Sequence, residues 1–374
     1  MQIINRIEMR FGLKMSDNQM IENKIGGGKN ASLPHKTQTK RIFGLDLIRV
    51  FASLFTIAGH FFSLHTQYMD TPFVGASMFV QGMAQMFFRG TPFFMLLSGY
   101  LLINKAFDNK YYHRGKKVII SYLFFSLVTI LFRVLYMGES CTVMQWGMKI
   151  LDFTAIPYGW YIEMWIGLFL LSPFINIMYH AIPTRKQKLL LIAILFGLSC
   201  MPLLTNRYGL SLLPEYWVDI YPLFFYLAGA YIREYRPIIN KWLGISIVLG
   251  ICLINPVFNI LFANGHDIIQ IAGGPTSAFG AILAVVVFLL FYQLDVKNIP
   301  LRQFVSFAAK MTLSIYLCCY IFDMIYYPWF KEHFFISQAQ FGAYFFIIVP
   351  LVFFSSMVVA WIKDWLFRLL HVKA

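Results

Sequence analysis

The chain has 374 residues, of which 59% are hydrophobic, 18% aromatic and only 13% charged, and its formal net charge is +14. A water-soluble protein of this length could not bury so much apolar surface, so the composition excludes a soluble globular protein and indicates a membrane protein. The basic residues fall in short clusters between apolar runs, as they do in membrane-protein loops, so the positive charge does not indicate nucleic-acid binding.

Residues 1–41 are polar and basic, and we expect a flexible cytoplasmic tail near anionic headgroups, with no cleaved signal peptide. A transmembrane helix needs about 20 mainly apolar residues. On this rule residues 42–366 form one all-α integral membrane domain, a bundle of about ten transmembrane helices, and residues 367–374 form a short cytoplasmic C-terminus. The predicted spans are 42–64, 78–103, 118–137, 157–179, 189–204, 217–232, 242–263, 275–293, 303–328 and 339–362.

The loop charges predict the orientation of these spans. With ten spans and a cytoplasmic N-terminus, nearly all Lys and Arg residues outside the spans fall on the cytoplasmic side. The outer loops keep only Lys149, Arg207 and Lys331. Because positive residues accumulate in cytoplasmic loops, we expect both termini inside.

The first span carries Asp46, Arg49 and His60 within an almost wholly apolar segment. Eleven helical residues at about 100° each bring His60 to within about 20° of the Arg49 azimuth, about 16 Å further along the axis. Both side chains therefore face one way at different membrane depths. Asp46 lies three residues before Arg49, on the same face, and can hold the guanidinium by a charge-assisted bond. The alternative is that Arg49 snorkels and His60 only packs.

The second span and the loop after it contain two further features. Ser98 and Gly99 are small residues that allow close helix approach inside the span 78–103. The following loop, "NKAFDNKYYHRGKK", is a cationic patch that includes Arg114 and Lys117. Such a patch can bind the phosphates of a cytosolic nucleotide-like ligand, or it can serve only as a topology signal that binds anionic lipid.

Ionisable residues inside a span are costly unless they are paired or hydrated, so each is a candidate functional residue. Three of them, Arg133, Asp219 and Lys310, lie close enough to predicted helix ends to snorkel. The five cysteines favour neither a disulfide framework nor a zinc site, and we expect no metal. The full set of ionisable residues is Asp46, Arg49, His60, Arg89, Arg133, Glu163, Asp219, Lys310 and Asp323.

Five segments follow one another in the order known from one family: "GLDLIRVFASLFTIAGHFF", "GTPFFMLLSGYLL", "YGWYIEMWIGLFLLSPFIN", "YPLFFYLAGAYI" and "MTLSIYLCCYIF". With its Arg-x10-His pair, the chain resembles the membrane-bound acyltransferase 3 family from about residue 40 to about residue 365. Two departures are visible. Cys318 and Cys319 follow Tyr316-Leu317 where many members have a histidine, and Arg114-x-x-Lys117 replaces an Arg-x-x-Arg pair.

The resemblance implies a multi-pass enzyme of the bacterial plasma membrane. Its activity would be O-acylation, usually O-acetylation, of an extracytoplasmic or lipid-linked glycan, with acyl-CoA as cytosolic co-substrate and no tightly bound cofactor. It implies catalytic roles for His60, Arg49 and Asp46. The implied acyl-CoA contacts are Arg49, Arg114, Lys117, Ser98 and Tyr100, and the implied glycan contacts are Glu163, Trp160 and Tyr316.

A sugar hydroxyl attacks a thioester only when a base removes its proton, and a neutral imidazole suits that role. His60 is therefore the general base, or alternatively a transient acyl carrier. Glu163 either orients His60, binds the acceptor or is structural. Two other functions stay open at this point: a transporter or flippase of a lipid-linked saccharide, and an inactive relative that assists assembly. The sequence shows no internal repeat of the kind many transporters have, and the Arg49 and His60 pair argues against an inactive relative.

Overall fold

The computed structural model describes residues 41–206, 211–262 and 277–370. The chain divides into two units, Met1–Arg41 and Ile42–Ala374. The predicted basic tail, apart from Arg41, lies outside the described residues, as do Arg207, the ends of the predicted spans near 263 and 275, and residues 371–374.

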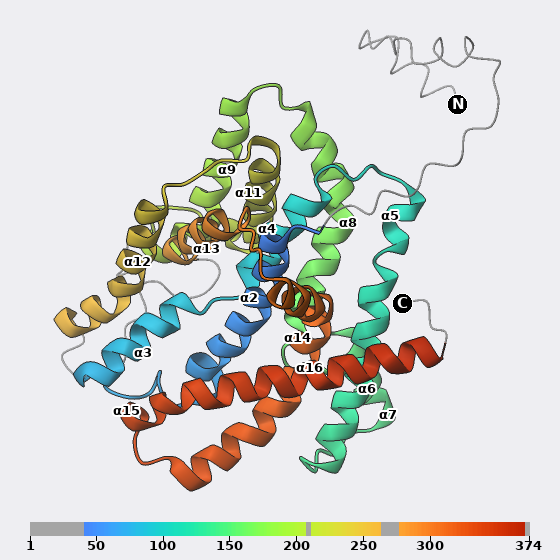
Figure 1. Ribbon diagram of the computed structural model, residues 1–374, viewed down its shortest axis with the longest axis vertical. Helices are drawn as coiled ribbons and strands as arrows, with labels where there is room; N and C mark the ends of the chain where they lie inside the picture. Colours follow the sequence, from blue (N-terminus) through green and yellow to red (C-terminus); the bar gives the residue numbers. More distant parts are fainter. Residues whose placement is uncertain (1–40, 207–210, 263–276, 371–374) are drawn as a thin grey trace. The chain divides into compact units, whose positions relative to one another are not determined.

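All regular elements of the described residues are helices, and none is a strand. The membrane unit therefore has the predicted all-α class (Figure 1). The longer helices are α2 (Phe43–His60), α3 (Gly75–Phe87), α4 (Thr91–Leu102), α6 (Lys116–Leu135), α8 (Trp160–Ala181), α9 (Arg185–Cys200), α11 (Tyr221–Tyr235), α12 (Lys241–Phe262), α13 (Ala278–Phe291), α14 (Ile299–Phe334) and α16 (Phe345–Leu369). The short elements are η1 (Phe61–His65), α5 (Asn109–His113), α7 (Val143–Leu151), α10 (Pro202–Thr205), η2 (Glu215–Ile220), α15 (Gln338–Phe341) and η3 (Gly342–Tyr344).

Six helical segments of the described residues are long and apolar enough to cross a membrane. They indicate a multi-pass membrane protein. Another, α13, is apolar but shorter. The total of about ten spans and the cytoplasmic placement of both termini stay predictions. The six segments are Phe43–His65, Tyr111–Leu135, Trp160–Ala181, Lys241–Phe262, Ile299–Phe334 and Gln338–Leu369.

The segment 78–103, expected as one span, consists of two helices. The helix α3 ends at Phe87 and α4 begins at Thr91, with Pro92 in its first turn. Proline has no backbone N–H to continue a preceding helix but fits the first turn of a new one. A Cβ atom at Gly90 would lie 2.0 Å from the backbone oxygen of Ala52, so the break packs directly against α2. The break therefore brings residues 88–90 beside the helix that carries His60.

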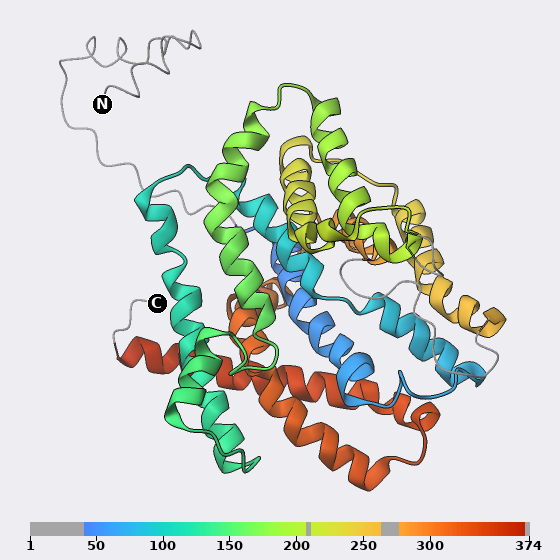
Figure 2. The ribbon, with the colours of Figure 1, turned by 180° about the vertical axis from the view of Figure 1, so that it is seen from behind.

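The helix α2 contacts α4, α13, α14 and α16, and it lies among them in both views (Figure 1, Figure 2). The helices α14 and α16 also pack against each other, as α4 does against α11. A Cβ atom at Gly99 would lie 1.8 Å from the backbone oxygen of Tyr226, and one at Gly229 would lie 2.0 Å from that of Leu96. The predicted close approach at Ser98-Gly99 is confirmed, and α11 supplies the second glycine.

Candidate active site

The predicted contact between Asp46 and Arg49 on the first helix is confirmed. The guanidinium Nη1 of Arg49 donates to Oδ1 of Asp46 at 2.8 Å. Asp46 is buried, whereas the Arg49 side chain is partly exposed. Arg49 lines a mainly apolar cavity of about 280 Å³ together with Ser98, Thr312 and Tyr316, which we call the Arg49 cavity. Asp46 therefore fixes a cation at the wall of this cavity.

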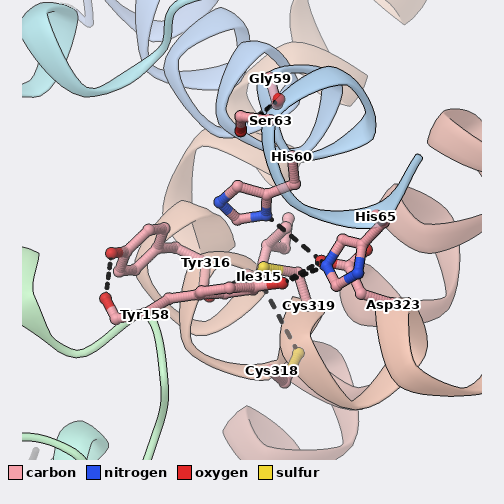
Figure 3. A network of polar contacts seen from close by, with 10 residues as sticks. All are labelled: Gly59, His60, Ser63, His65, Tyr158, Ile315, Tyr316, Cys318, Cys319 and Asp323. Carbon is pink, nitrogen blue, oxygen red and sulfur yellow. Dashed lines mark hydrogen bonds and ion pairs between the residues drawn. The ribbon is translucent and has the colours of Figure 1, made fainter. Parts of the chain in front are cut away.

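At the other end of α2, His60 is held by a buried carboxylate from α14. Its Nδ1 lies 3.2 Å from Oδ2 of Asp323, and the Asp323 side chain is fully buried (Figure 3). The other oxygen of Asp323, Oδ1, is buried and has no hydrogen-bond partner among the residues in 41–206, 211–262 and 277–370. A charged carboxylate beside one ring nitrogen fixes the ring and favours the tautomer in which Nδ1 carries the proton. The lone pair of Nε2 is then free to accept a proton.

A second histidine meets the same carboxylate because α2 continues as the π-helical turn η1. In a regular α-helix, five residues would rotate His65 by about 140° from His60. The wider π turn brings His65 back to the same side, and its Nε2 lies 3.5 Å from Oδ2 of Asp323. His65 Nε2 also lies 2.5 Å from the hydroxyl of Tyr158. The π turn therefore places two imidazoles around one carboxylate.

Two tyrosines complete this network. The hydroxyl of Tyr158 donates to Oδ2 of Asp323 at 2.9 Å, and the Tyr158 ring lies 4.0 Å from the His60 ring between centroids. The hydroxyl of Tyr316 in turn donates to the backbone oxygen of Tyr158 (Figure 3). Residues from α2, α14 and the segment before α8 therefore hold His60 in place.

His60 opens into a second cavity, of about 430 Å³, which we call the His60 cavity. Its wall includes Tyr158 from the segment before α8 and Trp160 at the start of α8. Residues 88–92, from the break between α3 and α4 and the first turn of α4, also line it. Tyr316 lines this cavity as well as the Arg49 cavity. The two cavities therefore meet at a single aromatic side chain, between a paired cation and an oriented imidazole.

Comparison with known proteins identifies the kind of enzyme that carries this arrangement. A family model described as an acyltransferase domain, that of the acyltransferase 3 family, matches residues 42–365. The chain belongs to the acyltransferase 3 family. Since six helices of the described residues are apolar and long enough to cross a membrane, it is a membrane acyltransferase. No curated protein and no solved structure matches the chain.

The structure brings some of the residues predicted for this acyltransferase to the two cavities. Ser98 lines the Arg49 cavity, Trp160 lines the His60 cavity and Tyr316 lines both. Arg114 is exposed, and Lys117 lines a separate basic cavity of about 350 Å³. The roles of these residues in binding acyl-CoA or the glycan stay predictions.

Two predicted residues lie elsewhere. Tyr100 points toward α11, where the Arg233 guanidinium lies 5.1 Å from its ring centroid, and it is not among the residues lining the Arg49 cavity. Glu163 is exposed in the first turn of α8. The carboxylate that orients His60 is therefore Asp323, not Glu163, because α14 rather than the start of α8 presents an acid to the imidazole.

Arg133 does not snorkel at the end of its helix. It is buried and forms a bidentate pair with Glu139, at 2.9 and 2.8 Å, while Nη1 donates to the backbone oxygens of Thr154 and Ala155. The hydrogen bonds that Arg133 donates to Glu139 lower the pKa of the Glu139 carboxyl below its ordinary value. Arg133 thus ties the end of α6 to the segment that leads into α8 and the site.

One group of residues in the described part of the chain has spacing that fits a metal ion. The ligand atoms of His60, Cys319 and Asp323 lie within 4.8 Å of one another. The Cys319 thiol, however, donates to the backbone oxygen of Tyr316 at 3.1 Å, and Asp323 already accepts from Tyr158. The hydrogen bonds therefore favour proton chemistry at this position.

Sequence reasoning assigned no role to Asp323, His65 or Tyr158. Asp323 was visible as a charge inside an apolar span, and that signal could have marked it as the partner of a catalytic group. His65 lies beyond the predicted helix, where only the π turn brings it to the site. Tyr158 carries no charge, and its role depends on contacts with residues far away in the sequence.

Proposed function

We propose that the protein is an O-acyltransferase of a bacterial plasma membrane. It transfers an acyl group, acetyl being our preferred one, from cytosolic acyl-CoA to a hydroxyl of an extracytoplasmic or lipid-linked glycan. The observation that carries this proposal is His60, hydrogen-bonded through Nδ1 to the buried Asp323 in a cavity that meets the Arg49 cavity at Tyr316.

The imidazole of His60 is the general base in this proposal. A sugar hydroxyl is a weak acid, so it attacks the thioester carbonyl only as its proton is transferred to a base. With Nδ1 engaged by Asp323, the free Nε2 accepts that proton, and the Asp323 carboxylate stabilises the imidazolium that forms. The proton is then available for the CoA thiolate that leaves.

Acyl-CoA would reach the site from the opposite end of α2. The apolar wall of the Arg49 cavity suits an acyl chain and its pantetheine arm. The basic cavity is lined by Lys117, Lys310, Lys363 and Arg368, and also by Asp364, which pairs with Lys363. Its excess of positive charge suits the phosphates of CoA. The two cavities are lined by consecutive residues of the same helices. On α6, Lys117 lines the basic cavity and Val118 lines the Arg49 cavity; on α14, Met311 lines the basic cavity and Thr312 lines the Arg49 cavity. In this proposal a single extended ligand occupies both cavities and reaches about 16 Å along α2 toward His60.

The experiment compares surface glycans from cells that express the wild-type protein, the His60→Ala variant or neither, by mass spectrometry. We expect a mass shift of one acyl group with the wild-type protein alone, while the variant inserts and folds normally. Acylation by His60→Ala at the parental rate would show that the assignment is wrong. A transporter would give no consumption of acyl-CoA, and an acyl carrier at His60 would leave an acylated enzyme when the acceptor is omitted.

A further inference from the structure

One arginine of the His60 cavity has no role in the mechanism above. Arg89 lies in the break between α3 and α4, and its side chain lines the cavity together with His60. The Nε and Nη2 atoms of its guanidinium are buried, and neither has a hydrogen-bond partner within the part of the chain that the structure describes. The other two arginines predicted inside spans are each paired with a carboxylate, Arg49 with Asp46 and Arg133 with Glu139.

Arg89 has no carboxylate among the residues that the structure describes. The ionisable groups that act on it electrostatically are Tyr68 and Cys252, neither of which carries a negative charge near neutral pH. Arg89 as a whole is half-buried, but buried N–H groups of a cation are costly when no acceptor meets them. An anion bound in the cavity would supply both the acceptor and the counter-charge.

A second unpaired group lies four residues earlier, in the last turn of α3. Gln85 also lines the His60 cavity, and its buried side-chain oxygen Oε1 has no hydrogen-bond partner among the described residues. The lining of one cavity thus offers both buried N–H donors and a buried acceptor. Their complement is a ligand that carries an oxyanion beside a hydroxyl, which is the chemistry of an acidic or phosphorylated sugar.

We propose that the acceptor bound in the His60 cavity is an anionic glycan. Its carboxylate or phosphate is bound by Arg89, and an adjacent hydroxyl donates to Gln85. This inference rests on the proposed function, because it identifies the class of acceptor that His60 deprotonates. The planar guanidinium fits either oxyanion through two parallel hydrogen bonds, which a neutral sugar cannot match.

The binding test uses the full-length protein in detergent micelles and follows tryptophan fluorescence, since Trp160 lines the same cavity. The probes are D-glucuronic acid, glucose 1-phosphate and glucose. We expect one or both anions to bind the wild-type protein about tenfold more tightly than glucose, and the preferred anion identifies carboxylate or phosphate as the natural group. Equal affinity for all three probes, or no binding of either anion, would overturn the proposal.

Three variants show whether Arg89 causes the preference. Arg89→Gln should remove it, and Arg89→Lys should keep part of it, because the charge remains without the planar fork. Arg302→Gln, which removes a partly exposed arginine paired with Asp295, should bind as the wild type does. A preference that persists in folded Arg89→Gln and Arg89→Lys protein would also overturn the proposal.

Binding requires no acyl transfer, so this result does not depend on whether the proposed function holds. A kinetic readout then separates the two ideas. Arg89→Gln should raise the KM for the preferred anionic sugar about tenfold and change kcat much less. If kcat fell while KM stayed unchanged, Arg89 would act at the reacting carbonyl and the anion-binding assignment would be wrong. Loss of activity in His60→Ala tests the enzyme itself.

Discussion

Replacement of Asp323 by asparagine tests the central feature of the site. The substitution keeps the shape of a fully buried side chain and removes its charge. Oδ2 of Asp323 accepts from Tyr158 at 2.9 Å and lies 3.2 Å from Nδ1 of His60, so asparagine loses one charge-assisted bond to each. A hydrogen bond to a charged group contributes about 1.5–3 kcal/mol. If that energy supports the imidazolium of the transition state, kcat falls about 10- to 150-fold in Asp323→Asn.

The assay is the release of CoA thiol from acetyl-CoA by the purified protein in lipid nanodiscs, with the melting temperature measured in parallel. Asp219→Asn, at an exposed position of η2, is the control for loss of a carboxylate and should keep the wild-type rate. A folded Asp323→Asn variant with unchanged kcat would refute the reasoning. Glu163→Gln tests the competing orienting residue, and a loss as large as that of Asp323→Asn would move the assignment to Glu163.

Two predictions concern stability. Gly99→Ala places a Cβ atom 1.8 Å from the backbone oxygen of Tyr226, so α4 and α11 must separate. We expect this to cost about 1–3 kcal/mol of stability and to lower the melting temperature. The control is Gly250→Ala in α12, where nothing lies within 4 Å of the added atom, and it should melt at or above the wild-type temperature. Equal melting temperatures for the wild type and both variants would contradict a tight packing of α4 against α11. Arg133 lowers the pKa of the Glu139 carboxyl in the folded protein. Their pair therefore stabilises the protein at pH values above the unfolded-state pKa of this carboxyl, and the stabilisation is lost as pH falls through its lower folded-state pKa. The melting temperature should therefore fall more steeply on acidification below about pH 5 in the wild type than in Glu139→Gln, and parallel curves would argue against the pair.

The sequence alone was sufficient for features that lie within one helix or depend on composition. Apolar content indicated a membrane protein, and the periodicity of the α-helix placed Arg49 and His60 on one face, with Asp46 positioned to pair with Arg49. The small residues at Ser98-Gly99 predicted a close helix approach that the structure contains. Such features are predictable because helix geometry relates residues three to eleven positions apart without reference to any neighbour.

The tertiary structure decided which groups meet across helices. Asp323 is 263 residues from His60 in the sequence, and only the packing of α14 against α2 brings them together. His65 joins them through a π turn that regular helix periodicity does not predict. Arg133 was expected to snorkel because it lies near a predicted helix end. Its pair with Glu139, which lies beyond the following turn, could not be predicted from that position. The physical reason is that a charge inside an apolar span shows the need for a partner, but which partner meets it depends on how the helices pack.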